Sequence, residues 1–203
     1  MSQYLDALPQ SLSLKGDYLI LEPLSLSHHE ELNQAAADGE LWNLEVTNVP
    51  DSASMHSVIE LALELKEQGS QLPFVVRRLS DQRVVGSTRY YRLNNTDRNL
   101  SIGYTWYSAS VHRTAINTEC KLLLLQHAFE VAGCISVQWH THHENFASQA
   151  AIKRLGAKFE GVLRNDKILS DGRIRHTHCF SMLDQEWPAS KEYLSSRLKY
   201  YSK

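Results

Sequence analysis

Three segments between residues 72 and 107 carry the β-branched and aromatic side chains that are typical of strands, and short polar links join them. The segments are LPFVVRRL (72–79), RVVGSTRYYRL (83–93) and LSIGYTWY (100–107). The links SDQ (80–82) and NNTDRN (94–99) have the composition of turns. Consecutive strands joined in this way are usually neighbours in one sheet, so this stretch predicts three antiparallel strands side by side.

The rest of the chain has helical and strand-like patterns on both sides of this stretch. They predict helices at 25–39, 51–69, 115–133, 145–156 and 186–201, and strands at 17–24, 134–142, 157–169 and 173–183. The last two strands are expected to form a hairpin across SDG (170–172). Because no repeat or linker is visible, we predict a single domain of α+β class over residues 1–203. In it, residues 1–16 form a loose N-terminal arm and residues 186–203 a C-terminal helix.

The composition excludes several classes of protein. Lysines and arginines number 21 against 23 aspartates and glutamates, which gives no electrostatic reason to expect nucleic acid or a membrane as a partner. The 3 cysteines, Cys120, Cys134 and Cys179, are too far apart for a disulfide framework or a zinc knuckle. No secretory signal and no stretch of membrane-spanning length is visible. We therefore expect a cytoplasmic protein with reduced thiols.

Three histidines and a glutamate fall within residues 140–144, in the stretch WHTHHENFAS (139–148). His140 and His142 share one face of the predicted strand and could chelate a metal ion. A zinc site usually needs four converging ligands, whereas His143 and Glu144 fall at the following turn and no cysteine is near in sequence. Since histidines at a strand end need no metal, we expect no metal site here.

The order and spacing of several motifs resemble the GCN5-related N-acetyltransferases (GNAT), and within them the group of ribosomal-protein alanine/serine N-acetyltransferases. The resemblance covers roughly residues 15–190. The motifs that carry it are LEPL, VVGSTRYYRL, IGYTWY, HRTAINTECKLLLLQHAF, ENFASQAAIKRLGAKFEGVLR and DGRIRHTHCFSMLDQEWP. The resemblance implies a twisted, mixed and mainly antiparallel sheet, flanked by helices, with a V-shaped opening between the fourth and fifth strands.

The resemblance also implies where acetyl-CoA binds. In the family, its pyrophosphate lies on a glycine-rich loop that opens the long helix, where backbone N–H groups and the helix dipole favour negative charge. The corresponding residues are His112, Arg113, Thr114, Ala115, Ile116 and Asn117. His112, Ala115 and Asn117 depart from the family pattern of Gln or Arg, central Gly, and final Gly or Ala. A small Ala115 still permits close backbone approach if its φ is negative. Arg113 adds a charge suited to phosphate.

The remaining cofactor contacts are implied on the fourth strand and on the short helix. Tyr104, Thr105 and Trp106 are expected to line the pantetheine arm through backbone groups, with the side chains of Tyr104 and Trp106 in the core. Asn145 matches a family residue that contacts this arm or the reactive end of the cofactor, and it also suits a helix N-cap. Many members carry a tyrosine proton donor seven residues later, where this chain has Ile152. Ser148 matches the serine of the ribosomal-protein group and is expected to be catalytic by assisting the leaving thiolate.

The general base is not marked by a motif. Glu45 in the unpatterned stretch 40–50 and Asp166 in the hairpin are the candidates, although surface carboxylates are common without a role. Arg89 and Tyr90 could reach the acceptor or serve the strand alone.

These features predict an N-acetyltransferase that moves an acetyl group from acetyl-CoA, without a metal, to a primary amine. The acceptor is a small molecule or a protein N-terminus, and a homodimer is compatible with the sequence. The alternative is a non-catalytic module on the same fold that binds acyl-CoA or regulates another protein, which the missing tyrosine and the non-glycine loop favour.

Overall fold

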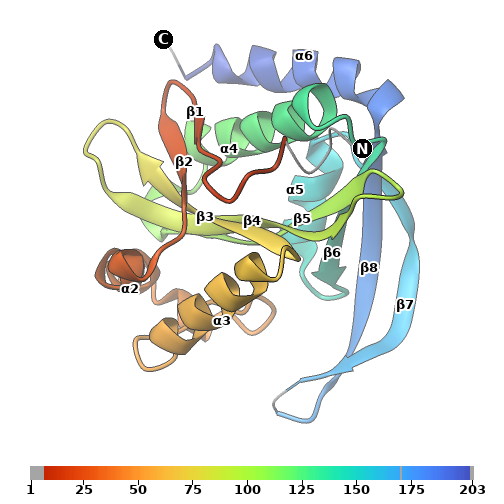
Figure 1. The fold of residues 1–203 in the computed structure, drawn as a ribbon. Coiled ribbons are helices and arrows are strands. Elements are labelled where there is room, and N and C mark those ends of the chain that lie inside the picture. Colours follow the sequence, from red (N-terminus) through yellow and green to blue (C-terminus); the bar gives the residue numbers. More distant parts are fainter. Residues whose placement is uncertain (1–6, 170, 202–203) are drawn as a thin grey trace.

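The strands of the protein form one sheet in the computed structural model, which describes residues 7–169 and 171–201. Within this described part the sheet has 8 strands, in the order β1-β2-β3-β4-β5-β6-β8-β7 (Figure 1). Their bounds are Leu14–Lys15 (β1), Leu19–Pro23 (β2), Gln71–Arg78 (β3), Val84–Asn94 (β4), Asn99–Tyr107 (β5), Ser136–His142 (β6), Lys158–Ile168 (β7) and Ile174–Leu183 (β8).

The helices are α2 (His29–Ala37), α3 (Met55–Glu67), α4 (Ala115–Gln126), α5 (Phe146–Arg154) and α6 (Trp187–Leu198). A π-helical turn, η4 (His127–Val131), continues α4. Short 3₁₀ turns are η1 (Leu26–His28), η2 (Leu41–Asn43), η3 (Ala109–Val111) and η5 (Asp184–Glu186). The stretch without a clear period, 40–50, therefore holds one short turn and otherwise irregular backbone.

The strand pairings confirm the predicted fold class. β2, β3, β4 and β5 pair antiparallel in sequence order, as their short links require. β5 and β6 run parallel, because the long helix α4 connects them across one face of the sheet. The α+β class with a mixed and mainly antiparallel sheet is thus correct.

Helices cover both faces of the sheet (Figure 1), and a hydrophobic core lies on each face. α4, α5 and α6 contribute to a core on one face, which includes Leu124, Ile152 and Leu194. α2 and α3 pack on the other face, around Leu32 and Ile59. Fully burying such a side chain stabilises the fold by roughly 1.5–3 kcal/mol.

The N-terminal residues differ from the loose arm that the sequence suggests. Residues 1–6 lie outside the described residues, but Leu8 is buried in the core and Leu14 packs against it. The turn into β2 is held by Glu119 of α4, whose carboxylate accepts hydrogen bonds from the backbone N–H groups of Asp17, Tyr18 and Leu19 at 2.7, 2.8 and 2.9 Å.

One predicted helix is shorter than expected, whereas the predicted hairpin is confirmed by the antiparallel pairing of β7 with β8. The α-helix expected over 115–133 ends at Gln126, and Val131 in the π-helical turn that follows is exposed. In the β7–β8 hairpin, Ser170 of the expected turn lies outside the described residues. Leu169 donates its N–H to the carbonyl of Arg173 and closes the turn, with Gly172 at φ 83°.

Among the described residues, no helix combines the length and the apolar character that crossing a bilayer would require.

Candidate functional site

β5 and β6 separate part-way along their length. They pair only at Asn99–Ser136, Leu100–Val137 and Ser101–Gln138, although both strands continue well beyond. From Ile102 onward, the edge of β5 that faces β6 therefore has backbone groups outside the ladder. Such groups need another partner, and an extended ligand can supply it. The sequence did not predict the two-residue strand β1, so β5 and β6 are the fourth and fifth predicted strands. The gap between them is the predicted V-shaped opening.

A bulge lies in β5 at the start of this opening. Ser87 pairs with Trp106 and Arg89 with Gly103, so Tyr104 and Thr105 together oppose the single residue Thr88. Tyr104 has a φ of 51°, a left-handed conformation that is unfavourable for a bulky residue. A bulge breaks the ladder and redirects its N–H groups, which makes this a place where backbone donors can point at a ligand.

The side chains of the two bulge residues, Tyr104 and Thr105, lie on opposite faces of the sheet. Thr105 points toward α4, where its Oγ1 lies 2.7 Å from Thr88 Oγ1 and accepts a hydrogen bond from Lys121 Nζ at 2.8 Å. Burial lowers the pKa of Lys121. Tyr104 points toward the α3 face and is half-exposed, whereas Trp106 is buried in the core of that face. The expectation that both aromatic side chains lie in the core is therefore wrong for Tyr104.

The loop before α4 carries the residues expected to hold the pyrophosphate. His112, Arg113 and Thr114 are exposed, and Arg113 has a φ of 62°. Thr114 is the N-cap, and His112 Nε2 lies 2.9 Å from the carbonyl oxygen of Tyr107. This turn leaves the N-terminus of α4 open to solvent beside a guanidinium, which is a suitable environment for an anion.

The next three residues can meet a phosphate mainly through the backbone. Ala115 and Ile116 have buried side chains, and Asn117 is half-buried. Ala115 is the first residue of α4 and has no positive φ, so the condition for close approach at this position is met. The first four N–H groups of an α-helix lack intrahelical partners. Thr114 Oγ1 accepts the N–H of Ile116 at 3.4 Å, and the N–H groups of Ala115 and Asn117 can donate to an anion.

Asn145 caps α5 and at the same time holds a distant loop. Its Oδ1 accepts a hydrogen bond from the Ser148 N–H at 2.9 Å. Its Nδ2 donates to the carbonyl oxygen of Val46 at 3.2 Å and to Thr47 Oγ1 at 3.1 Å. Asn145 therefore fixes the irregular segment 44–50 against the start of α5.

Ser148 lies in the first turn of α5 and is half-buried. Among the described residues, no group is hydrogen-bonded to its hydroxyl, so this hydroxyl can bind a ligand. One turn later, Ile152 is buried in the core on the α4 face. The position that holds a tyrosine donor in many family members thus serves packing in this chain.

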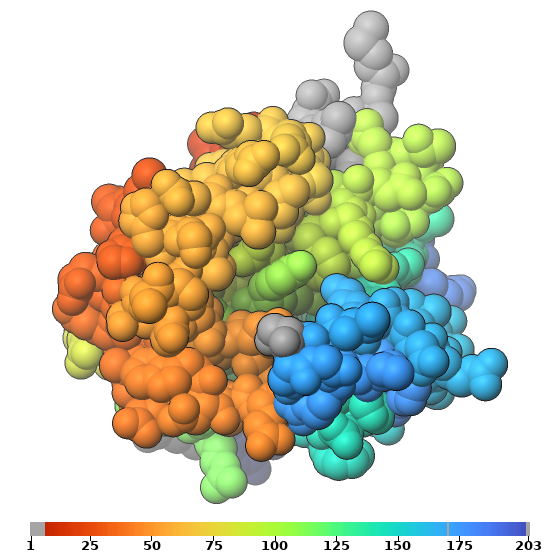
Figure 2. Space-filling view, turned by 90° about the horizontal axis from the view of Figure 1, so that it is seen from below, coloured from red at the N-terminus to blue at the C-terminus, as the bar shows by residue number. Residues whose placement is uncertain are grey.

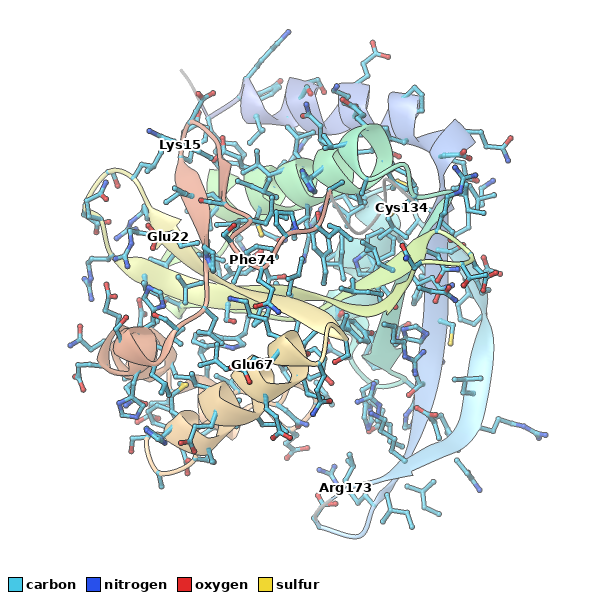
Figure 3. All side chains as sticks on the ribbon, in the orientation of Figure 1. Lys15, Glu22, Glu67, Phe74, Cys134 and Arg173 are labelled. Carbon is cyan, nitrogen blue, oxygen red and sulfur yellow. The ribbon has the colours of Figure 1, made fainter. Side chains whose placement is uncertain are left out.

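Of the two candidate bases, Asp166 belongs to β7 of the β7–β8 hairpin, and Glu45 of segment 40–50 contacts that hairpin. Glu45 is 80% exposed and forms an ion pair with Arg173 at 3.7 Å. Arg173 lies near the tip of the hairpin (Figure 3). Asp166 is exposed and accepts a hydrogen bond from Thr177 Oγ1 at 2.6 Å. Neither carboxylate is enclosed, so the structure gives no desolvated base at either position.

A group of polar residues lies on the α3 face beside the opening, and the sequence did not indicate that they contact one another. Tyr91 Oη is 3.1 Å from His140 Nδ1, and Arg92 Nη1 is 3.1 Å from His140 Nε2. Because arginine can only donate, Nε2 is the acceptor and the neutral ring carries its hydrogen on Nδ1. The Tyr91 ring also packs on Gly103, where a Cβ would come within 2.7 Å.

Burial sets the protonation of this group. It lowers the pKa of His140 to about 4, with Arg92 as the next contributor, and it raises the pKa of Tyr91 to about 12. Both side chains are therefore neutral near pH 7. Alternation along β4 could have indicated Tyr91, since it shares a face with Arg89. Tyr90 points the other way, is fully buried and donates to the carbonyl of Leu124.

A pocket lies between α3 and this face of the sheet, beside the opening. Its polar lining comes from Arg89, Tyr104, Ser87 and Asn48, and Pro50 also lines it. Its remaining lining is apolar and consists of Leu24, Leu32, Met55, Val58, Ile59 and Trp106. Figure 2 shows this side of the molecule hollowed between the orange and yellow segments around α3 and the blue β7–β8 hairpin, with green atoms of the β5 region inside.

The histidine cluster is arranged differently from the predicted chelating pair. His140 is bonded to Tyr91 and Arg92, while potential ligand atoms of His142, His143 and Glu144 lie within 4.8 Å of one another. His142 Nδ1 already accepts the N–H of Glu144 at 3.1 Å. The expected absence of a metal here stays a prediction.

Comparison with known proteins identifies relatives of this arrangement. The acetyltransferase (GNAT) domain family matches residues 18–158. A GCN5-related N-acetyltransferase from Brucella melitensis has a similar structure, with a TM-score of 0.83, 28% sequence identity, and coverage of 94% of this chain and 86% of that chain. No curated protein matches the sequence.

Two more distant structures share the fold. Mycobacterium smegmatis RimJ, solved in complex with CoA-disulfide, has a TM-score of 0.76 and 20% identity, over 92% of this chain and 95% of that chain. An acetyltransferase from Salmonella typhimurium that modifies the N-terminal serine of ribosomal protein L7/L12 has a TM-score of 0.74 and 15% identity, over 85% of this chain and 99% of that chain. The resemblance to the ribosomal-protein group thus extends to the fold.

Proposed function

The chain belongs to the GNAT acetyltransferase family, and from this premise we propose that it transfers an acetyl group from acetyl-CoA to a primary amine. One observation carries the proposal: the sheet opens between β5 and β6 at the bulge of β5, and α4, which connects these two strands, begins with an open N-terminus. An extended thioester substrate with a pyrophosphate matches both features.

The pyrophosphate would bind at the start of α4. Backbone N–H groups of residues 115–117 and the helix dipole favour negative charge there, and Arg113 adds a full positive charge. The pantetheine arm would then run along the edge of β5 that β6 leaves unpaired, and its amides would pair with Tyr104, Thr105 and Trp106 through the backbone. RimJ, which shares the fold, was solved with a CoA derivative.

The reaction would take place at the bulge. The amine nitrogen attacks the thioester carbonyl carbon, a C–N bond forms, and the C–S bond breaks to release the CoA thiolate. N–H groups freed by the bulge would stabilise the negative charge on the carbonyl oxygen. The Ser148 hydroxyl would donate a hydrogen bond to the thiolate sulfur as negative charge develops there, and it would keep its own proton.

The attacking amine must first lose a proton, because an ammonium group has no lone pair. No carboxylate lines the pocket beside the bulge among the described residues. The proton would therefore leave through water, with Glu45 and Asp166 at the hairpin as its candidate acceptors.

A coupled measurement of thiol release and product mass tests the proposal. With acetyl-CoA and a panel of primary amines, free CoA thiol should form together with the acetylated amine. If acetyl-CoA binds but thiol release equals the rate without protein for every amine, including peptides, the chain is a binding module rather than an enzyme.

A further inference from the structure

We propose that the amine acceptor carries a carboxylate beside its amine and an apolar side chain, as a small amino acid does, and that Arg89 binds this carboxylate. The inference rests on the proposed acetyl transfer and names the substrate class of the same site.

Arg89 is a buried cation that lacks an anionic partner. The residue is 8% exposed and lines the pocket between α3 and the sheet. Among the described residues, its guanidinium has one hydrogen-bond acceptor, Gln71 Oε1 at 3.2 Å, and its buried Nε has none. A guanidinium has five N–H donors, so most of its capacity is left for a ligand.

A second arginine of the same sheet shows the usual arrangement. Arg77 donates from Nε to Glu22 at 2.8 Å and from Nη1 to Glu31 at 2.6 Å. It therefore has two carboxylate partners although it is less buried than Arg89. Burying a charge without a partner is costly, so an unpaired buried arginine in a pocket indicates a place for an anionic ligand.

The guanidinium is held in position rather than flexible. Gln71, which accepts its hydrogen bond, is itself buried and donates to the carbonyl oxygen of Ala62 in α3 at 3.0 Å. On the other side, the Arg89 Cζ lies 4.1 Å from the centre of the Tyr104 ring. Burial lowers the pKa of Arg89, which agrees with the absence of a compensating anion. A fixed guanidinium is suited to bidentate recognition of a carboxylate.

The location of Arg89 limits the distance between the carboxylate and the reacting amine. Arg89 pairs with Gly103, next to the bulge at which the thioester would react. An anion on Arg89 would therefore be only a few bonds from the amine. Leu32, Met55 and Ile59 form an apolar wall of the same pocket, which would receive an apolar side chain.

Matched acceptors test the proposal. Leucine, methionine and phenylalanine are each compared with their amides and with the amines that lack the carboxyl group. For the unmodified protein we expect kcat/KM to be at least about 30-fold higher for the amino acids. Without the carboxylate, the buried guanidinium of Arg89 has no charged partner, and the loss of such a partner typically weakens binding by that factor or more. Comparable rates for the amides, or a preference for peptides with amidated C-termini, would overturn the proposal.

Variants locate the preference at Arg89. Arg89→Met should abolish the difference between each amino acid and its amide, while Arg89→Lys should keep part of it. The control is Arg78→Met, because Arg78 is the last residue of β3 and already has an anionic partner, Asp81. A preference that survives in Arg89→Met, when circular dichroism shows that this variant is folded, would assign the carboxylate to another residue and refute the proposal.

Product binding separates this inference from the proposed reaction. N-acetyl-leucine should raise the Tm of the unmodified protein more than N-acetyl-leucinamide does, and Arg89→Met should remove that difference. If no amine is acetylated but this difference is present, the reaction is wrong and the carboxylate site stands. If amines are acetylated and the two compounds give equal shifts, the carboxylate site is wrong.

Discussion

The contacts of Asn145 allow stability and acceptor binding to be separated by substitution. Asn145→Ala removes the N-cap of α5, which is worth about 1 kcal/mol, and two hydrogen bonds to segment 44–50, each worth about 1 kcal/mol. Water can replace part of these interactions because the residue is only half-buried. We expect the free energy of unfolding to fall by about 2 kcal/mol.

Asn145→Asp separates the two roles. The carboxylate keeps the cap and suits the helix N-terminus, but it can no longer donate to Val46 and Thr47. We expect a loss of about 1 kcal/mol, with a higher KM for the acceptor, because segment 44–50 carries Asn48 and Pro50 of the pocket. The family resemblance implies a contact of Asn145 with the pantetheine arm, but both ends of its amide already bond within the protein, so we expect the Kd for CoA to stay the same.

Urea unfolding and calorimetry with CoA measure these quantities. Gln34→Ala is the control, because the exposed side chain of this glutamine bonds to Glu30 on the same helix, α2, and its loss should cost a few tenths of a kcal/mol. If Asn145→Asp keeps full stability and acceptor KM but weakens CoA several-fold, Asn145 serves the pantetheine arm instead of the loop.

Three further predictions concern the cofactor, the thiolate and pH. Arg113→Ala should raise the Kd for CoA roughly 5- to 10-fold by calorimetry, as loss of one charge-assisted contact predicts; an unchanged Kd would place the pyrophosphate elsewhere. Ser148→Ala should lower kcat roughly 10- to 100-fold with an unchanged Kd for CoA, measured where chemistry limits the rate; an unchanged kcat would remove Ser148 from the reaction. Because the pKa of His140 is lowered to about 4, its unfolded form binds more protons between pH 6.5 and 4, so the free energy of unfolding should fall as pH falls through this range. After allowance for partial exposure, His140 accounts for roughly 1–2 kcal/mol of this fall in the free energy of unfolding. Urea unfolding of His140→Gln should therefore show a weaker pH dependence than the unmodified protein. The same pH dependence in both proteins would refute this.

The fold could be predicted because local rules and tertiary structure agree over most of the chain. Short polar links joined β3, β4 and β5 as antiparallel neighbours, and Thr114 and Asn145 stand where caps of α4 and α5 were expected. In such places sequence neighbours decide the structure. The elements that hold the site were located correctly for the same reason.

The bulge in β5 could not be predicted, because no local residue signals it. Strict alternation would place Leu100, Ile102 and Trp106 on one face of the sheet. In the structure, Leu100 and Ile102 belong to the core under α4, while Trp106 belongs to the core under α3. The extra residue reverses the faces between them, at a tyrosine whose φ is normally unfavourable.

Long-range contacts explain the remaining differences. Asn145 was recognised as a cap, but its bonds to residues 46 and 47, nearly a hundred positions away, depend on the packed fold. The pairing of Tyr91 with His140 and the isolation of Arg89 arise in the same way, from strands and helices brought together in space. Glu45 and Asp166 were candidates for the general base by residue type alone, because the sequence does not show whether a carboxylate is buried or exposed.

A crystal structure of the protein with acetyl-CoA tests the central claim most directly. We expect the pyrophosphate at the N-terminus of α4 beside Arg113, the pantetheine arm along the free edge of β5, and the thioester at the bulge next to Tyr104. Acetyl-CoA bound outside the opening between β5 and β6, with the backbone of the bulge still free, would contradict the account.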